Sequence, residues 1–183
     1  MKNQGFILHL AFLALIVFAF PNCSKKSGGG TVTPPATTFK FTVNGTIYNW
    51  NGNSADNPLN GGSRIFKTSY NGSTWYGLAA SPANSGLTAL ITLKLNTATL
   101  SVATYTWTAT SVTSWTVADH YCGVPTGLIC TSSEIGDYAT VIITNKHDGY
   151  VDGTFTARLT NADGSLVKVN VTDGEFHNVK IVE

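Results

Sequence analysis

The sequence predicts an all-β protein, an antiparallel sandwich or flattened barrel of about nine or ten strands in a single domain. Two observations support this fold class. The 183 residues include 26 threonines, which favour strand surfaces and are poor helix formers. Several segments alternate apolar and polar residues with a period of two, whereas no stretch of ten residues has a helical period.

Residues 1–22 are predicted to be a secretory signal peptide. Residues 6–20 are apolar at 14 of 15 positions, follow Lys2, and end at the polar pair Pro21-Asn22. A helix of this length rises only about 22 Å, which is shorter than the apolar core of a bilayer. The segment therefore suits a cleaved leader better than a membrane span.

Cys23 follows the leader directly, and this arrangement resembles the lipobox of bacterial lipoproteins. The resemblance implies that the Cys23 thiol is acylated and that this residue becomes the mature N-terminus, so that lipid attaches the protein to a membrane. Phe20, Pro21 and Asn22 replace the aliphatic and small residues usual before this cysteine. An ordinary signal peptide cut nearby is the alternative.

Residues 23–38 are expected to be a lipid-anchored flexible tether, because residues 24–38 are mostly Gly, Ser, Thr and Pro. Residues 39–183 then form the β domain, whose 145 residues are enough for one core. Without the leader the chain is neutral, with 10 basic and 10 acidic side chains. This balance lacks the positive charge that nucleic-acid binding normally requires, so no nucleic-acid partner is expected.

Residues 39–50 predict a hairpin, because Asn44-Gly45 between two alternating runs is a strong hairpin signal. A two-residue turn there puts five apolar side chains on one face: Phe39, Phe41, Val43, Tyr48 and Trp50.

Later segments extend the same pattern. Residues 87–95 and 151–160 alternate, with Val151, Gly153, Phe155, Ala157 and Leu159 facing inward in the second segment. In residues 100–109 the inward positions are Leu100, Val102, Tyr105, Trp107 and Ala109, which requires a bulge near 103–104. Turns are predicted at residues 71–73, 147–149, 161–164 and 173–174, and the last hairpin needs a register slip at residues 177–178.

Three short motifs are similar to those of small Bacteroidota lipoproteins of uncharacterised function. They are the Asn44-Gly45 hairpin, a pair of G-x-F strands at residues 153–155 and 174–176, and the aliphatic pair Val179 and Ile181. The resemblance implies an antiparallel β fold and residence in the cell envelope, at the outer membrane or in the periplasm. It carries no catalytic residues. Ser24-Lys25-Lys26 departs from the acidic surface-export signal of that phylum, which leaves the leaflet open.

Cys122 and Cys130 are expected to form a disulfide, because lipidation of Cys23 leaves an even pair in an oxidising compartment. Unpaired thiols are one alternative. Zinc held by Asp119, His120 and Cys122 is a weaker one, since the spacing matches no recognised zinc motif.

The sequence contains no catalytic motif, so we expect a protein that is not an enzyme and needs no cofactor or metal. The histidines outside the leader lie in three separate segments. Asn161, Asp163 and Ser165 alternate like the start of a calcium loop, but a turn explains them as well. Residues 39–118 carry four basic side chains and one acidic side chain, whereas residues 119–183 carry four basic and nine acidic side chains.

Aromatic side chains are the remaining candidates for a binding site. Trp50 and Trp107 fit inward positions, whereas core packing explains Trp75, Tyr76 and Trp115 less well. These three are therefore the candidates for a surface platform on which a sugar stacks, with core packing as the alternative. We therefore expect a non-enzymatic, lipid-anchored envelope protein that serves as a binding or structural module. The alternative is a glycan-binding accessory lipoprotein of a nutrient-uptake system. Under either function, the expected partners of this protein are the membrane and either carbohydrate or an envelope protein.

Overall fold

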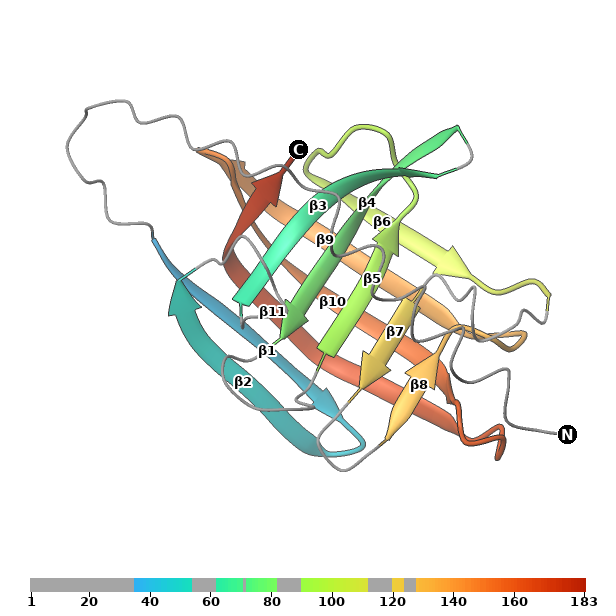
Figure 1. Ribbon diagram of the computed structural model, residues 1–183. Helices are drawn as coiled ribbons and strands as arrows, with labels where there is room; N and C mark the ends of the chain where they lie inside the picture. Colours follow the sequence, from blue (N-terminus) through green and yellow to red (C-terminus); the bar gives the residue numbers. More distant parts are fainter. Residues whose placement is uncertain (1–34, 54–61, 71, 82–89, 112–119, 124–127) are drawn as a thin grey trace, which may run out of the picture. The chain divides into compact units, whose positions relative to one another are not determined.

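The computed structural model describes residues 35–53, 62–70, 72–81, 90–111, 120–123 and 128–183, which lie in one compact unit, Pro34–Glu183. The fold is all-β, as predicted (Figure 1). The described residues contain no helix and eleven strands: β1 (Ala36–Val43), β2 (Thr46–Asn53), β3 (Gly62–Tyr70), β4 (Ser73–Ser81), β5 (Leu90–Leu95), β6 (Ala103–Thr108), β7 (His120–Gly123), β8 (Ile129–Thr131), β9 (Tyr138–His147), β10 (Tyr150–Asn161) and β11 (Lys168–Val182).

The strands form one sheet in the order β2-β1-β11-β3-β4-β5-β7-β8-β10-β9-β6. Because β10 and β11 also pair with each other, the seven strands from β11 through β3 and β8 to β10 close into a ring. In Figure 1, β3, β4, β5, β7 and β8 lie in front of β9, β10 and β11. All described pairings are antiparallel except the one between the end of β11 and β3. The result is a flattened barrel extended by β1, β2, β6 and β9.

The first hairpin is confirmed pair for pair. Phe39 lies opposite Trp50, Phe41 opposite Tyr48, and the two turn residues between them have positive φ angles of 47° and 84°. This geometry is the type I′ turn that an Asn-Gly pair favours. The strand itself starts at Ala36, so the last three residues expected in the tether belong to β1.

The core between the two layers centres on four phenylalanines. Phe39, Phe41, Phe155 and Phe176 are all almost fully buried. Their ring centroids lie 5.3 Å apart for Phe39 and Phe155, and 6.3 Å apart for Phe155 and Phe176. These spacings are in the range of favourable aromatic pairs. Strands β1, β10 and β11 are therefore joined by side-chain packing as well as by backbone hydrogen bonds.

The two G-x-F motifs are cross-strand partners. In the pairing of β10 with β11, Gly153 lies opposite Phe176 and Phe155 lies opposite Gly174. A Cβ added at Gly153 would lie 2.5 Å from Phe176 Cζ, and one at Gly174 would lie 2.6 Å from Phe155 Cγ. Each phenylalanine ring thus covers the glycine of the other strand, which explains why glycine stands at both positions.

The hairpin predicted at residues 173–174 is not present, because β11 continues through them as one strand of 15 residues. Asp173 has a φ of 52°, and the register with β1 shifts between Lys40 and Thr42. The Asp-Gly pair therefore forms a bulge rather than a turn. The slip expected at residues 177–178 is confirmed, since Asn178 has a φ of 53° and both Phe176 and Val179 are buried.

Residues 100–109 also differ in part from the prediction. Leu100 is buried and both Tyr105 and Trp107 are half-buried, as expected, but Val102 is 58% exposed. β6 begins at Ala103, so Val102 belongs to the preceding loop and no bulge is needed.

Candidate functional site

The aromatic residues expected to form a binding platform do not share one surface. Trp75 and Tyr76 are neighbours on β4, so their side chains point to opposite faces of the sheet. Tyr76 is 2% exposed, and its hydroxyl donates a hydrogen bond of 3.0 Å to Glu183 Oε1. Burial, followed by this contact with Glu183, raises the pKa of Tyr76. Tyr76 is therefore a core residue, Trp75 is only partly exposed on the outer face, and Trp115 lies outside the described residues.

On the outer face, Trp75 belongs to a row of alternating cations and rings that we call the β3–β5 stripe: Arg64, Phe66, Trp75 and Lys94. The Arg64 Cζ atom lies 5.3 Å from the centroid of Phe66, and Lys94 Nζ lies 5.3 Å from that of Trp75. The two rings meet edge to face at 6.0 Å. All four side chains are partly exposed. Cations over ring faces are attracted by the ring quadrupole, which holds the charged groups in place.

The local sequence explains why these side chains gather. Along β3, Arg64 and Phe66 alternate with the buried Ser63 and Ile65, so they face outward. Phe66 lies opposite Gly77, which in turn lies opposite Lys94 on β5. Because Gly77 has no side chain, the Phe66 ring lies over it, and a Cβ there would be 2.5 Å from Phe66 Cζ. The glycine therefore lets the ring lie close to the sheet, beside Trp75.

Cys122 and Cys130 are free thiols in this structure, so the predicted disulfide is not observed. The register nevertheless places them directly opposite each other on β7 and β8. Directly opposed residues of antiparallel strands have Cα atoms about 4.5–5.5 Å apart, within the range that a disulfide spans. Both are buried, and desolvation raises the pKa of each thiol to about 12, with the neighbouring Cys130 adding to the effect on Cys122. Almost no thiolate forms at neutral pH, so neither suits nucleophilic catalysis.

His120, which was a candidate zinc ligand, is fully buried beside these thiols. Its backbone N–H donates to Ser132 Oγ at 3.0 Å, and its ring lies 4.5 Å from that of Trp107. The ring nitrogen Nε2 is 3.3 Å from the Lys94 carbonyl oxygen. In the part of the chain that the structure describes, no group of three or more His, Cys, Asp or Glu side chains could hold a metal ion. Asp119 lies outside that part.

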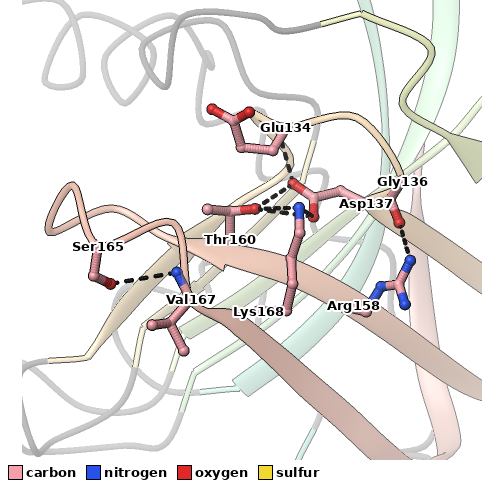
Figure 2. A network of polar contacts seen from close by, with 8 residues as sticks. All are labelled: Glu134, Gly136, Asp137, Arg158, Thr160, Ser165, Val167 and Lys168. Atoms are coloured by element: carbon pink, nitrogen blue, oxygen red, sulfur yellow. Dashed lines mark hydrogen bonds and ion pairs between the residues drawn. The ribbon is translucent and has the colours of Figure 1, made fainter.

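A buried carboxylate, Asp137, joins the loop after β8 to β10 and β11 (Figure 2). Its oxygen atoms accept hydrogen bonds from the Glu134 backbone N–H at 3.0 Å and from Thr160 Oγ1 at 2.9 Å. Lys168 Nζ lies 2.7 Å from Asp137 Oδ1 and also donates to Thr160 Oγ1 at 2.8 Å. A buried charge with a cation and several donors is satisfied where it stands. The network therefore suits a structural role, which is to hold this loop against the barrel.

Arg158 extends the same network along β10. Its Nη2 atom donates to the Gly136 carbonyl oxygen at 2.6 Å, and its guanidinium lies 5.3 Å from the centroid of Tyr138. The loop of residues 132–137 is thus fixed by contacts from both sides of Asp137.

A second polar cluster brings together two histidines that lie far apart in the sequence. His147 Nε2 is 3.4 Å from Asp152 Oδ2, and His177 Nδ1 is 3.9 Å from Asp152 Oδ1. Asp152 also accepts the Asn178 backbone N–H at 2.8 Å and the Asn145 amide at 3.1 Å. Partial burial acts to raise the pKa of Asp152, but these donors and the histidines together hold it below its usual value. The cluster caps the bulge of β11 at Asn178.

The segment that resembles the start of a calcium loop is a turn between β10 and β11. Asp163 accepts the Ser165 backbone N–H at 2.8 Å and the Asn161 side-chain amide at 2.8 Å. These bonds to nearby residues are the contacts that stabilise an Asx-type turn. Hydrogen bonds from Ser165 lower the pKa of Asp163.

No protein-family model, curated protein or solved structure matches the chain. No helix among the described residues is long and apolar enough to cross a membrane. The β3–β5 stripe is thus the candidate site that its own geometry supports best, because its charged and aromatic groups face outward and contact one another.

Proposed function

We propose that this protein is a non-enzymatic, lipid-anchored binding module of the cell envelope, and that its ligand is a carbohydrate. The observation that carries the binding role is the β3–β5 stripe, where Phe66 and Trp75 meet edge to face on the outside of the barrel. Partly exposed rings offer apolar surface to the C–H groups of a sugar, while neighbouring charged groups and hydroxyls offer polar contacts.

Anchoring is supported by the position of Cys23 directly after the apolar leader. A single acyl chain binds membranes weakly, whereas several chains on one residue bind firmly. The Cys23→Ala variant should therefore move from the membrane to the soluble fraction. Radioactive fatty acid supplied to growing cells should label the wild-type protein and not the variant. Retention of the variant on membranes after a high-salt wash would contradict the anchoring.

In an oxidising envelope compartment, Cys122 and Cys130 should form a disulfide bond. They are opposed on β7 and β8, and no other described cysteine competes for them. Thiol titration of the exported protein under denaturing, non-reducing conditions tests this pairing. Two reactive thiols per chain would exclude the disulfide, and none would support it.

A further inference from the structure

We infer that the β3–β5 stripe binds an acidic polysaccharide, meaning a polymer of sugars that carries a carboxylate on successive residues. This inference rests on the proposed function, since it names the class of carbohydrate that the same surface takes. The sequence composition does not suggest it, because the mature chain is neutral overall.

The two cations of the stripe are too far apart to serve one small anion. Arg64 lies opposite Ala79 on β4, and Ala79 lies opposite Thr92 on β5, two residues before Lys94. Two strand spacings sideways and two residues along the strand separate their Cα atoms by about 12 Å. Arg64 is held over Phe66 and Lys94 over Trp75, which keeps the two charges apart. A chain with repeated negative charges can contact both.

The surface between the cations suits a sugar ring. Phe66 and Trp75 fill it, and Gly77 beneath Phe66 keeps that ring close to the sheet. Thr68 and Thr92 are partly exposed at neighbouring outward positions of β3 and β5, where their hydroxyls can bond sugar hydroxyls. The order along the stripe is therefore cation, ring, ring, cation.

Charge complementarity favours a polyanion at this face. At their outward positions, strands β3, β4 and β5 carry Arg64 and Lys94 and no aspartate or glutamate, whereas Lys67 is on the opposite face with Tyr76. Asp137, Asp152 and the other acidic side chains of the described residues belong to the segment from Glu134 to Glu183. A locally positive face attracts an anionic polymer even though the whole chain is neutral.

An anionic membrane surface fits this face less well than a polysaccharide. Membrane-inserting surfaces present protruding apolar side chains, whereas Phe66 and Trp75 are only partly exposed. The large apolar side chains that are well exposed in the described residues lie on other elements: Ile47, Val102, Ile129, Ile135, Ile142, Leu166 and Val167. The stripe therefore favours a ligand that lies along the sheet.

The test uses the full exported chain in detergent with two matched ligands, polygalacturonate and its fully methyl-esterified, neutral form. Isothermal titration should show that the wild type binds the acidic polymer at least about tenfold more tightly than the ester. The Arg64→Gln/Lys94→Gln variant should lose about tenfold for the acidic polymer only, together with most of the salt dependence. Trp75→Ala should weaken binding to both polymers.

Lys40→Gln, which removes one charge from β1 outside the stripe, is the matched control for the single variants Arg64→Gln and Lys94→Gln. It should bind like the wild type. The glutamine variants should keep the wild-type melting temperature, and Trp75→Ala should remain folded at the assay temperature. Equal losses in Lys40→Gln and in each single stripe variant would overturn the inference, since binding would then follow net charge alone. In the Cys23→Ala background, which lacks the lipid anchor and needs no detergent, binding to vesicles of anionic lipid that is lost with the stripe substitutions, together with no polygalacturonate binding, would overturn it in favour of a membrane.

The outcomes also separate this inference from the proposed function. If both polymers bind equally through Trp75, the carbohydrate-binding function stands and the preference for acidic chains is wrong. If neither polymer binds, both are wrong. Anchoring through Cys23 is tested independently by fractionation.

Discussion

Substituting alanine for Gly153 should destabilise the barrel strongly, because the position has no space for a methyl group. A Cβ there would overlap the Ile142 carbonyl oxygen on β9 and lie 2.5 Å from Phe176 Cζ on β11. Gly153 is therefore enclosed by the backbone of one neighbouring strand and the buried ring of another. Neither can move away without breaking strand pairing or disturbing the phenylalanine core.

The expected cost follows from comparing Gly153 with Gly77. Overpacking a core position costs about 1–3 kcal/mol, and contact with a fixed backbone atom puts Gly153→Ala near the upper end. Gly77 has a similar contact of 2.5 Å, but its three nearest atoms all belong to the Phe66 ring, a side chain that is partly exposed and can turn aside. Gly77→Ala should therefore cost less than about 1 kcal/mol. For a unit of this size, about 3 kcal/mol lowers the melting temperature by roughly 6–12 °C.

Thermal unfolding followed by circular dichroism, with urea midpoints as a second measure, tests this comparison. The reasoning requires a clearly larger loss for Gly153→Ala than for Gly77→Ala. Similar losses in the two variants, or a loss below about 1 kcal/mol at Gly153, would refute it.

Three further predictions concern charge. Lys168→Met should cost about 2 kcal/mol because the buried Asp137 loses its cation, and the added Asp137→Asn change should recover part of it in urea denaturation; simple additivity of the two changes would contradict this. In reduced protein, folding raises the thiol pKa values of Cys122 and Cys130 from 9.0 to about 12. The contribution of these thiols to the free energy of unfolding is therefore complete below pH 9 and is lost as the pH rises towards 12. The melting temperature should then fall more steeply in that interval for the wild type than for Cys122→Ala/Cys130→Ala, and parallel curves would count against the assignment. The pKa of Asp152 is held below its usual value of 3.8. The contribution of this carboxylate to the free energy of unfolding is therefore present above pH 3.8 and is lost as the pH falls through the lowered pKa. The melting temperature of the Asp152→Asn variant should fall less between pH 5 and pH 2 than that of the wild type. An equal fall in both proteins would exclude stabilisation by the ionised Asp152.

Local signals predict much of the fold, and they fail where contacts between distant strands decide it. The Asn44-Gly45 turn and the period of two fix the register of β1 against β2. Asp173-Gly174 has the composition of a turn, but Gly174 is a glycine because Phe155 of β10 lies over it. Strands β7 and β8, with four and three residues, are too short for alternation to be detected.

The candidate site depends even more on register. Strand alternation alone separates Trp75 from Tyr76, since adjacent residues of a strand face opposite ways, and that signal is present in the sequence. No sequence signal places Arg64 and Phe66 beside Lys94, because β3 and β5 meet only through β4. Asp137 was missed for a similar reason, since its partners Thr160 and Lys168 are more than twenty residues away.

The position of β11 in the sheet has a consequence for how the chain acquires its structure. This strand pairs with β1, β3 and β10, and Thr42 lies opposite Thr172 across 130 residues of sequence. Pairing between such distant segments makes folding slow, on the scale of milliseconds to seconds. Until residues 168–182 are available, β1 has no partner on one side and the ring cannot close. We therefore expect an incomplete chain to remain unfolded, which is the state in which a polypeptide can still be threaded through a narrow export channel.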